Sequence, residues 1–132
     1  MILIGGGVGF SLIARSIPED ADKLFEEAIA ASMKGDAVTL TKNTDLLKKF
    51  PERISQQKYL EAIYLVAMSR PLKAIPLLKE VAKDPALKLR ALNLMGGAYA
   101  AATDRKTAIA TFELVLKEDE NAHDTRLNIA RR

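Results

Sequence analysis

Small residues and prolines recur in this chain at intervals of 34 positions. Ala74 is followed by Ala108, Ala62 by Gly96 and Pro51 by Pro85, each after that interval. A period of this length is typical of helix pairs that stack on one another, because a single pair cannot bury its apolar faces alone. The sequence therefore predicts an all-α fold, a solenoid of about three antiparallel helix hairpins.

Apolar residues at helical spacing, separated by turn signals, predict the individual helices. Pro18 and the acidic Asp20 and Asp22 suit the first turn of a helix, and Gly35 suits its end. The segment from Tyr59 to Met68 is apolar nearly all round, so we expect it to be covered on more than one face. The predicted helices span 18–34, 37–49, 52–68, 71–83, 86–102 and 104–117, with a short capping helix over 123–132.

Composition excludes several classes of function. The chain has 132 residues, of which 48% are hydrophobic and 28% charged, and it contains no cysteine. This predicts one small domain without disulfides, thiolate catalysis or cysteine-bound zinc. The net charge of +3 is not gathered into a basic face with interleaved aromatics, so nucleic-acid binding is not expected.

No catalytic constellation accompanies the helices. The one histidine, His123, stands beside Asp124 near the chain end, where we expect a surface role. The acidic run 118–120 has no histidine or cysteine beside it and predicts a solvated turn, and no phosphate-binding loop occurs. We expect neither an enzyme, a bound metal nor a cofactor.

Residues 1–17 form a separate apolar segment, without a charged side chain before Arg15. Fourteen helical residues reach about 21 Å, less than the ~30 Å hydrocarbon core, and the segment lacks the basic start and cleavage site of a secretory signal. Gly5 and Gly9 have the spacing that lets membrane helices approach closely. The glycine run also suggests a dinucleotide-binding turn, but Phe10 replaces the third glycine. We expect a membrane anchor or a packed helix.

The last two long helices resemble a tetratricopeptide repeat. That family pattern combines a large apolar residue, a Leu-Gly pair and a tyrosine on one helix with small and aromatic residues on the next. The matching positions here are Leu92, Met95, Gly96, Tyr99, Ala108, Phe112 and Val115. Weaker copies lie 34 and 68 residues earlier, where Leu40 replaces the expected small residue of the first hairpin. The resemblance covers residues 21–122 and predicts close packing at Gly96.

The resemblance implies that a partner helix or peptide binds in a groove lined by the first helix of each hairpin. The implied groove residues are Phe25, Ile29, Met33, Tyr59, Ile63, Val66, Asn93, Gly97 and Ala100. One branch of the family holds a C-terminal carboxylate with charged and amide groups at such positions. Here only Asn93 remains of that set, so we expect an apolar groove. The chain's own N-terminal segment or a twin subunit could also fill it.

The function that follows is that of a scaffold or assembly subunit with three parts: an anchor over 1–17, repeats over 18–122 and a cap over 123–132. The layout is similar to bacterial membrane-anchored tetratricopeptide proteins, which implies an inner-membrane location with periplasmic repeats. Arg15 on the repeat side argues for the opposite orientation. A soluble adaptor for transient peptide ligands is the alternative.

Overall fold

A computed structural model describes the backbone of residues 20–131 and the side chains of residues 20–119. All regular elements in this part of the chain are helices, which confirms the predicted all-α class. They are α2 (Ala21–Met33), α3 (Ala37–Leu47), a 3-10 turn η1 (Pro51–Arg53), α4 (Ile54–Ala67), α5 (Pro71–Val81), α6 (Lys88–Ala101) and α7 (Arg105–Arg131). The expected anchor over 1–17, with Gly5 and Gly9, lies outside the described residues.

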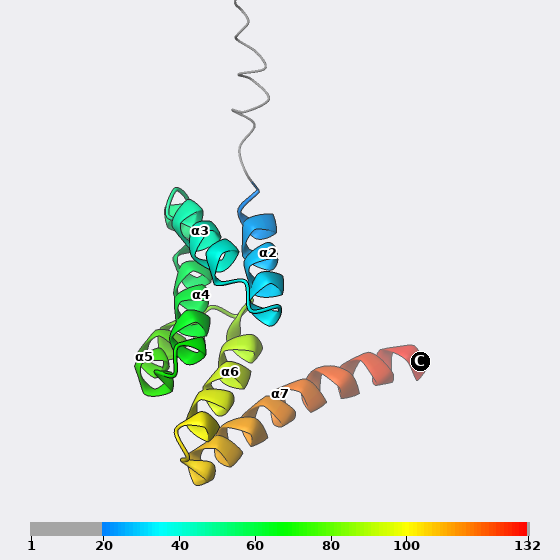
Figure 1. Cartoon of the computed structure of the whole chain (residues 1–132). Helices are drawn as coiled ribbons and strands as arrows, with labels where there is room; N and C mark the ends of the chain where they lie inside the picture. The colour runs from blue at the N-terminus through cyan, green and yellow to red at the C-terminus, as the bar shows by residue number, and fades with distance from the viewer. Residues whose placement is uncertain (1–19, 132) are drawn as a thin grey trace, which may run out of the picture.

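The helices pack as three successive pairs. α2 lies against α3, α4 against α5, and α6 against α7, with a short turn inside each pair (Figure 1). Neighbouring pairs are joined by contacts of α3 with α4 and of α5 with α6, while α4 also touches α2 and α6. The first helices of the three pairs, α2, α4 and α6, are therefore neighbours in space although they alternate with α3 and α5 along the chain.

The turn inside each pair has the same backbone geometry, at positions 34 apart. Gly35, Ser69 and Thr103 adopt left-handed φ values of 77°, 64° and 65°. The residue after each of them donates its backbone N–H to a carbonyl five positions earlier, which is the Schellman arrangement that ends a helix. These bonds are Asp36 to Ala31 at 2.8 Å, Arg70 to Leu65 at 2.8 Å and Asp104 to Tyr99 at 2.9 Å.

The helices after these turns begin with sequence-encoded caps. The Asp36 carboxylate accepts the backbone N–H of Thr39 at 3.0 Å, and Asp104 accepts that of Thr107 at 3.2 Å. The hydrogen bonds from Thr39 lower the pKa of Asp36. The helix after the remaining turn, α5, begins with Pro71. Proline is tolerated there because the N–H of a first helical residue has no hydrogen-bond partner within the helix.

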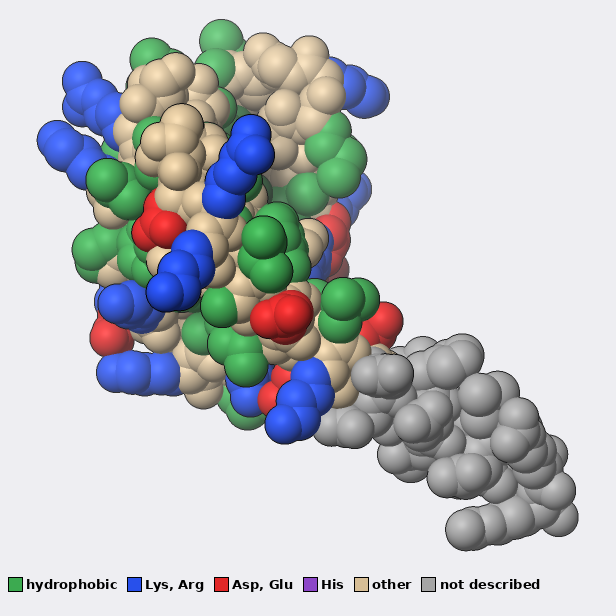
Figure 2. Space-filling view, turned by 90° about the horizontal axis from the view of Figure 1, so that it is seen from below, with side chains coloured by type: hydrophobic (Ala, Val, Ile, Leu, Met, Phe, Trp, Pro, Cys, Tyr) green, Lys and Arg blue, Asp and Glu red, His purple; other side chains and the backbone are tan. Residues whose placement is uncertain are grey.

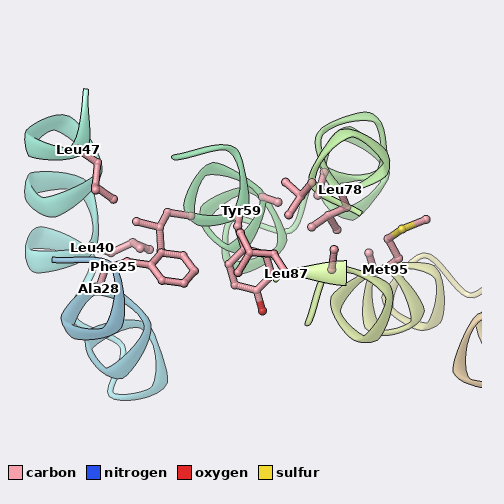
Figure 3. Close-up of a cluster of buried hydrophobic side chains, with 14 of the residues drawn as sticks. Phe25, Ala28, Leu40, Leu47, Tyr59, Leu78, Leu87 and Met95 are labelled. Carbon is pink, nitrogen blue, oxygen red and sulfur yellow. The ribbon is translucent and has the colours of Figure 1, made fainter. Parts of the chain in front are cut away.

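Small residues lie where the two helices of a pair meet. Ala28 and Ala62 are fully buried, and Gly96 follows at the equivalent place in α6. A Cβ atom on Gly96 would lie 2.5 Å from the ring of Phe112, so the predicted close packing at this glycine is confirmed. In the first pair the larger Leu40 is also buried, at the place where Ala74 and Ala108 stand in the other pairs. Figure 3 shows this core between the helices.

α7 differs from the expectation in length. It runs from Arg105 to Arg131 without interruption, whereas we expected one helix over 104–117 and a separate cap over 123–132. The connecting segment 118–122 contains neither glycine nor proline, and glutamate and alanine favour helix. The acidic charges of this segment therefore do not end the helix.

Candidate functional site

Two of the predicted groove residues belong to the core. Phe25 is 1% exposed and Tyr59 8% exposed, so the expectation that both face an open groove is wrong. Their rings meet edge to face, with centroids 5.8 Å apart, and burial raises the pKa of the Tyr59 phenol. Figure 3 shows the Tyr59 ring beside that of Phe25.

Arg90 of α6 covers these two rings. Its guanidinium carbon lies 5.2 Å from the centre of the Phe25 ring and 5.8 Å from that of Tyr59. It donates hydrogen bonds of 3.0 and 3.2 Å to the two carboxylate oxygens of Glu26 on α2, and this pairing raises the pKa of Arg90. A bidentate pair over two aromatic faces fixes the guanidinium plane. We call this group, Glu26, Arg90, Phe25 and Tyr59, the clamp.

The clamp closes one end of the face formed by α2, α4 and α6. A second link at this end joins Asp22 of α2 to Arg53, and Gln56 of α4 donates to the same carboxylate at 2.9 Å. Hydrogen bonds from Gln56 and Arg53 lower the pKa of Asp22. Glu26 and Arg90 were not among the predicted site residues because 64 positions separate them, although Arg90 stands 34 positions after Gln56 and 68 after Asp22.

The other end of the same face is apolar and open. Its central row is formed by Ile29, Ile63 and Gly97, which stand 34 positions apart on α2, α4 and α6 and are all half-buried. A Cβ atom on Gly97 would have no other atom within 4 Å, and Met33 is 82% exposed. We call this region the groove face; it consists of Ile29, Ser32, Met33, Ile63, Val66, Ala67, Gly97, Ala100 and Ala101.

None of the nine residues of the groove face is charged. Of the predicted groove residues, Ile29, Met33, Ile63, Val66, Gly97 and Ala100 occupy corresponding positions on the neighbouring helices α2, α4 and α6, whereas Phe25 and Tyr59 lie beneath the clamp. Asn93 is exposed. The groove face therefore offers apolar contact, whereas the clamp end of the same helices carries the Glu26–Arg90 and Asp22–Arg53 ion pairs.

The opposite side of α4 has a hollow that the sequence pattern did not reveal. It has a volume of about 430 Å³, with Leu60, Leu65 and Leu77 on its apolar walls and Asp45 and Lys48 at its rim. These two rim residues form an ion pair at 3.1 Å. The further lining residues are Thr41, Thr44, Glu61 and Tyr64. Helical periodicity in α4 could have separated this face from the groove face, but the space between α3 and α5 depends on tertiary packing.

Among the residues whose side chains are described, no three histidine, cysteine, aspartate or glutamate side chains lie close enough together to hold a metal ion. None of the helices between residues 20 and 131 combines the length and apolar character needed to cross a membrane. No protein-family model matches this chain, and no curated protein or solved structure is significantly similar to it.

Proposed function

We propose that this chain is a non-catalytic scaffold built as a tetratricopeptide-like solenoid. The three Schellman turns at 34-residue intervals support this architecture, because stacked repeats require the same chain reversal in each unit. The buried small residues Ala62, Ala74 and Ala108 support it too, since they let the helices of a pair approach. Such folds act through the surface that their first helices present.

The observation that carries the functional proposal is the uncharged groove face on α2, α4 and α6. Apolar surface that stays in contact with water across three helices is typical of interaction sites. An uncharged surface with a glycine-lined space at Gly97 fits the apolar side of a helix or peptide from a partner protein. The ion pair of the clamp and the neighbouring Asp22–Arg53 pair limit how far such a segment extends toward the start of α2.

The partner in this proposal is a subunit of a membrane protein complex, and residues 1–17 attach the scaffold to the bacterial inner membrane with its repeats in the periplasm. The apolar character of that segment supports the attachment. The alternative is a soluble adaptor that binds transient peptides on the same groove face. The two differ in whether the partner remains bound during purification from detergent-solubilised membranes.

Site-specific photo-cross-linking in the parent cells tests the groove face. We expect p-benzoylphenylalanine at Met33 to form a discrete adduct with one protein, identified by mass spectrometry. The matched control is the same probe at Val38, which is also highly exposed but lies on α3. If both positions give the same adducts, or neither gives one, the groove face is not the binding surface.

Arginine substitutions then test the contact with the identified protein. Ile63→Arg places a charge in the centre of the groove face and should abolish binding, because an unpaired buried charge costs several kcal/mol. Ile54→Arg is the control: Ile54 is exposed and lies nine residues earlier on α4, on the opposite side of the helix at about 100° per residue. Because Ile63 also packs against the core, Met33→Arg provides a variant without a folding cost. Retained binding by both groove variants would contradict the proposal.

A further inference from the structure

α7 carries a second apolar surface, away from the groove face. Ile109, Phe112 and Leu116 are 59%, 36% and 64% exposed, and their spacing of three and four residues places them in one row along the helix. Hydrophobic side chains reach the surface between charged ones at the end of the molecule seen in Figure 2. We call this row the α7 stripe.

The equivalent row of the preceding pair is covered. Ile75 and Leu78 of α5 stand 34 positions before Ile109 and Phe112, and they are 7% and 0% exposed, because α6 of the next pair packs against α5. Within the described part of the chain, no further pair follows α7 in this way. The α7 stripe therefore has the position of a stacking surface: Ile109 and Leu116 lie open to solvent, and Phe112, whose ring also packs against Gly96 of α6, is exposed over about a third of its surface.

Charges of opposite sign stand at the two ends of the α7 stripe. Arg105 precedes it and Asp119 follows it; both are exposed, and at about 100° per residue they fall on the same side of α7 as Phe112. The fourteen helical steps from Arg105 to Asp119 correspond to about 21 Å along the helix axis, and Phe112 is at the midpoint. Such a row is self-complementary: turned by 180° about an axis through Phe112, it sets Arg105 against Asp119 at both ends and Ile109 against Leu116 between them.

We propose that the α7 stripe binds a second copy of this chain, with the two α7 helices antiparallel about a two-fold axis near Phe112. A two-fold interface needs one patch that complements itself, and this row satisfies the condition in both its charges and its apolar centre. The apolar N-terminal segment is a poorer occupant, because residues 1–14 contain no charged side chain to pair with Arg105 or Asp119. The proposal is independent of the partner that binds the groove face.

Sedimentation velocity of the full chain in detergent solution tests the dimer. The parent protein should have twice the mass of one chain at micromolar concentration, and Leu116→Arg should weaken dimerisation at least about tenfold, because it buries an unpaired charge against Ile109 of the second copy. Leu114→Arg is the matched control: Leu114 is 53% exposed, but its position is half a helical turn away from the α7 stripe, so the dimer should remain. A monomeric parent, or a Leu116→Arg variant that dimerises like the parent, would overturn the proposal.

Charge reversal separates this geometry from unspecific apolar association. Arg105→Glu places two carboxylates together at both ends of the interface and should weaken the dimer, whereas the double variant Arg105→Glu, Asp119→Arg should restore it. Recovery in the double variant requires that the two residues face each other across the axis. Equal weakening in the single and double variants would overturn the antiparallel pairing, and circular dichroism checks that each variant keeps its helical content.

Discussion

At the scale of single residues, two adjacent glycines of α6 have different tasks. The Cα of Gly96 faces the Phe112 ring so closely that a Cβ would lie 2.5 Å from it, whereas a Cβ on Gly97 would meet no atom within 4 Å. Gly96 therefore sets the distance between α6 and α7, and Gly97 leaves space on the groove face. Both glycines cost the helix about the same backbone entropy relative to alanine, so a comparison between them isolates the packing effect.

Replacing each glycine by leucine should separate these tasks. Gly96→Leu should lower the free energy of unfolding by about 1–3 kcal/mol, because overpacking against Phe112 outweighs the ~1 kcal/mol gained by removing a glycine from a helix. Gly97→Leu should leave stability unchanged or raise it, since it gains the same helix propensity in open space. Urea unfolding of both variants decides the matter. Equal stabilities would mean that the Phe112 ring swings away from α6 at negligible cost.

At the scale of elements, the turns differ in how well their residues suit the backbone. Glycine adopts a left-handed φ without a steric penalty, but Ser69 and Thr103 carry a Cβ in the same conformation, and threonine is β-branched. The second and third turns are thus locally less favourable than the first, although all three form the same Schellman hydrogen bonds. The chain keeps the geometry because the packing of each helix pair depends on it.

Glycine substitutions in these turns should therefore stabilise the fold. We expect Ser69→Gly to raise the free energy of unfolding by up to about 1 kcal/mol and Thr103→Gly by slightly more, because both relieve the left-handed strain. The reciprocal change Gly35→Ser should lower it by a similar amount. Denaturant unfolding measures the change in free energy for each of the three variants, provided that the m value stays the same. A loss of stability in both glycine variants would show that the serine and threonine side chains stabilise these turns.

Apart from α7, the helices were predictable from the sequence to within a few residues, because apolar spacing and turn residues such as Gly35 and Pro71 act locally. The burial of each side chain was not predictable in the same way. Phe25 and Ile29 both fall on the inner side of α2, but the first is buried and the second half-buried, since Arg90 arrives from a helix more than 60 positions later. Periodicity along one helix defines its faces, and only the packing of the other helices decides which part of a face remains open.

At the scale of the whole molecule, the N-terminal segment, the groove face and the α7 stripe use different parts of the chain. The chain enters the described part at α2, and α7 with the α7 stripe follows all the other helices (Figure 1). The groove face lies on α2, α4 and α6, so it uses elements from all three pairs. Membrane attachment through the N-terminal segment, partner binding and dimerisation would therefore use different residues, and each can be removed without the others.

Deletion of residues 2–17 tests the membrane attachment on this basis. We expect the truncated chain to leave the membrane fraction of the cells, because the ~14 apolar residues that favour lipid are gone. It should keep the helices α2 to α7, and sedimentation should still find it dimeric, since Ile109, Phe112 and Leu116 are retained. An internal control is Leu116→Arg in the full chain, which should remain with the membranes as a monomer. If the truncated protein still sediments with membranes, the attachment resides in the helical domain or its partner, and residues 1–17 are not the anchor.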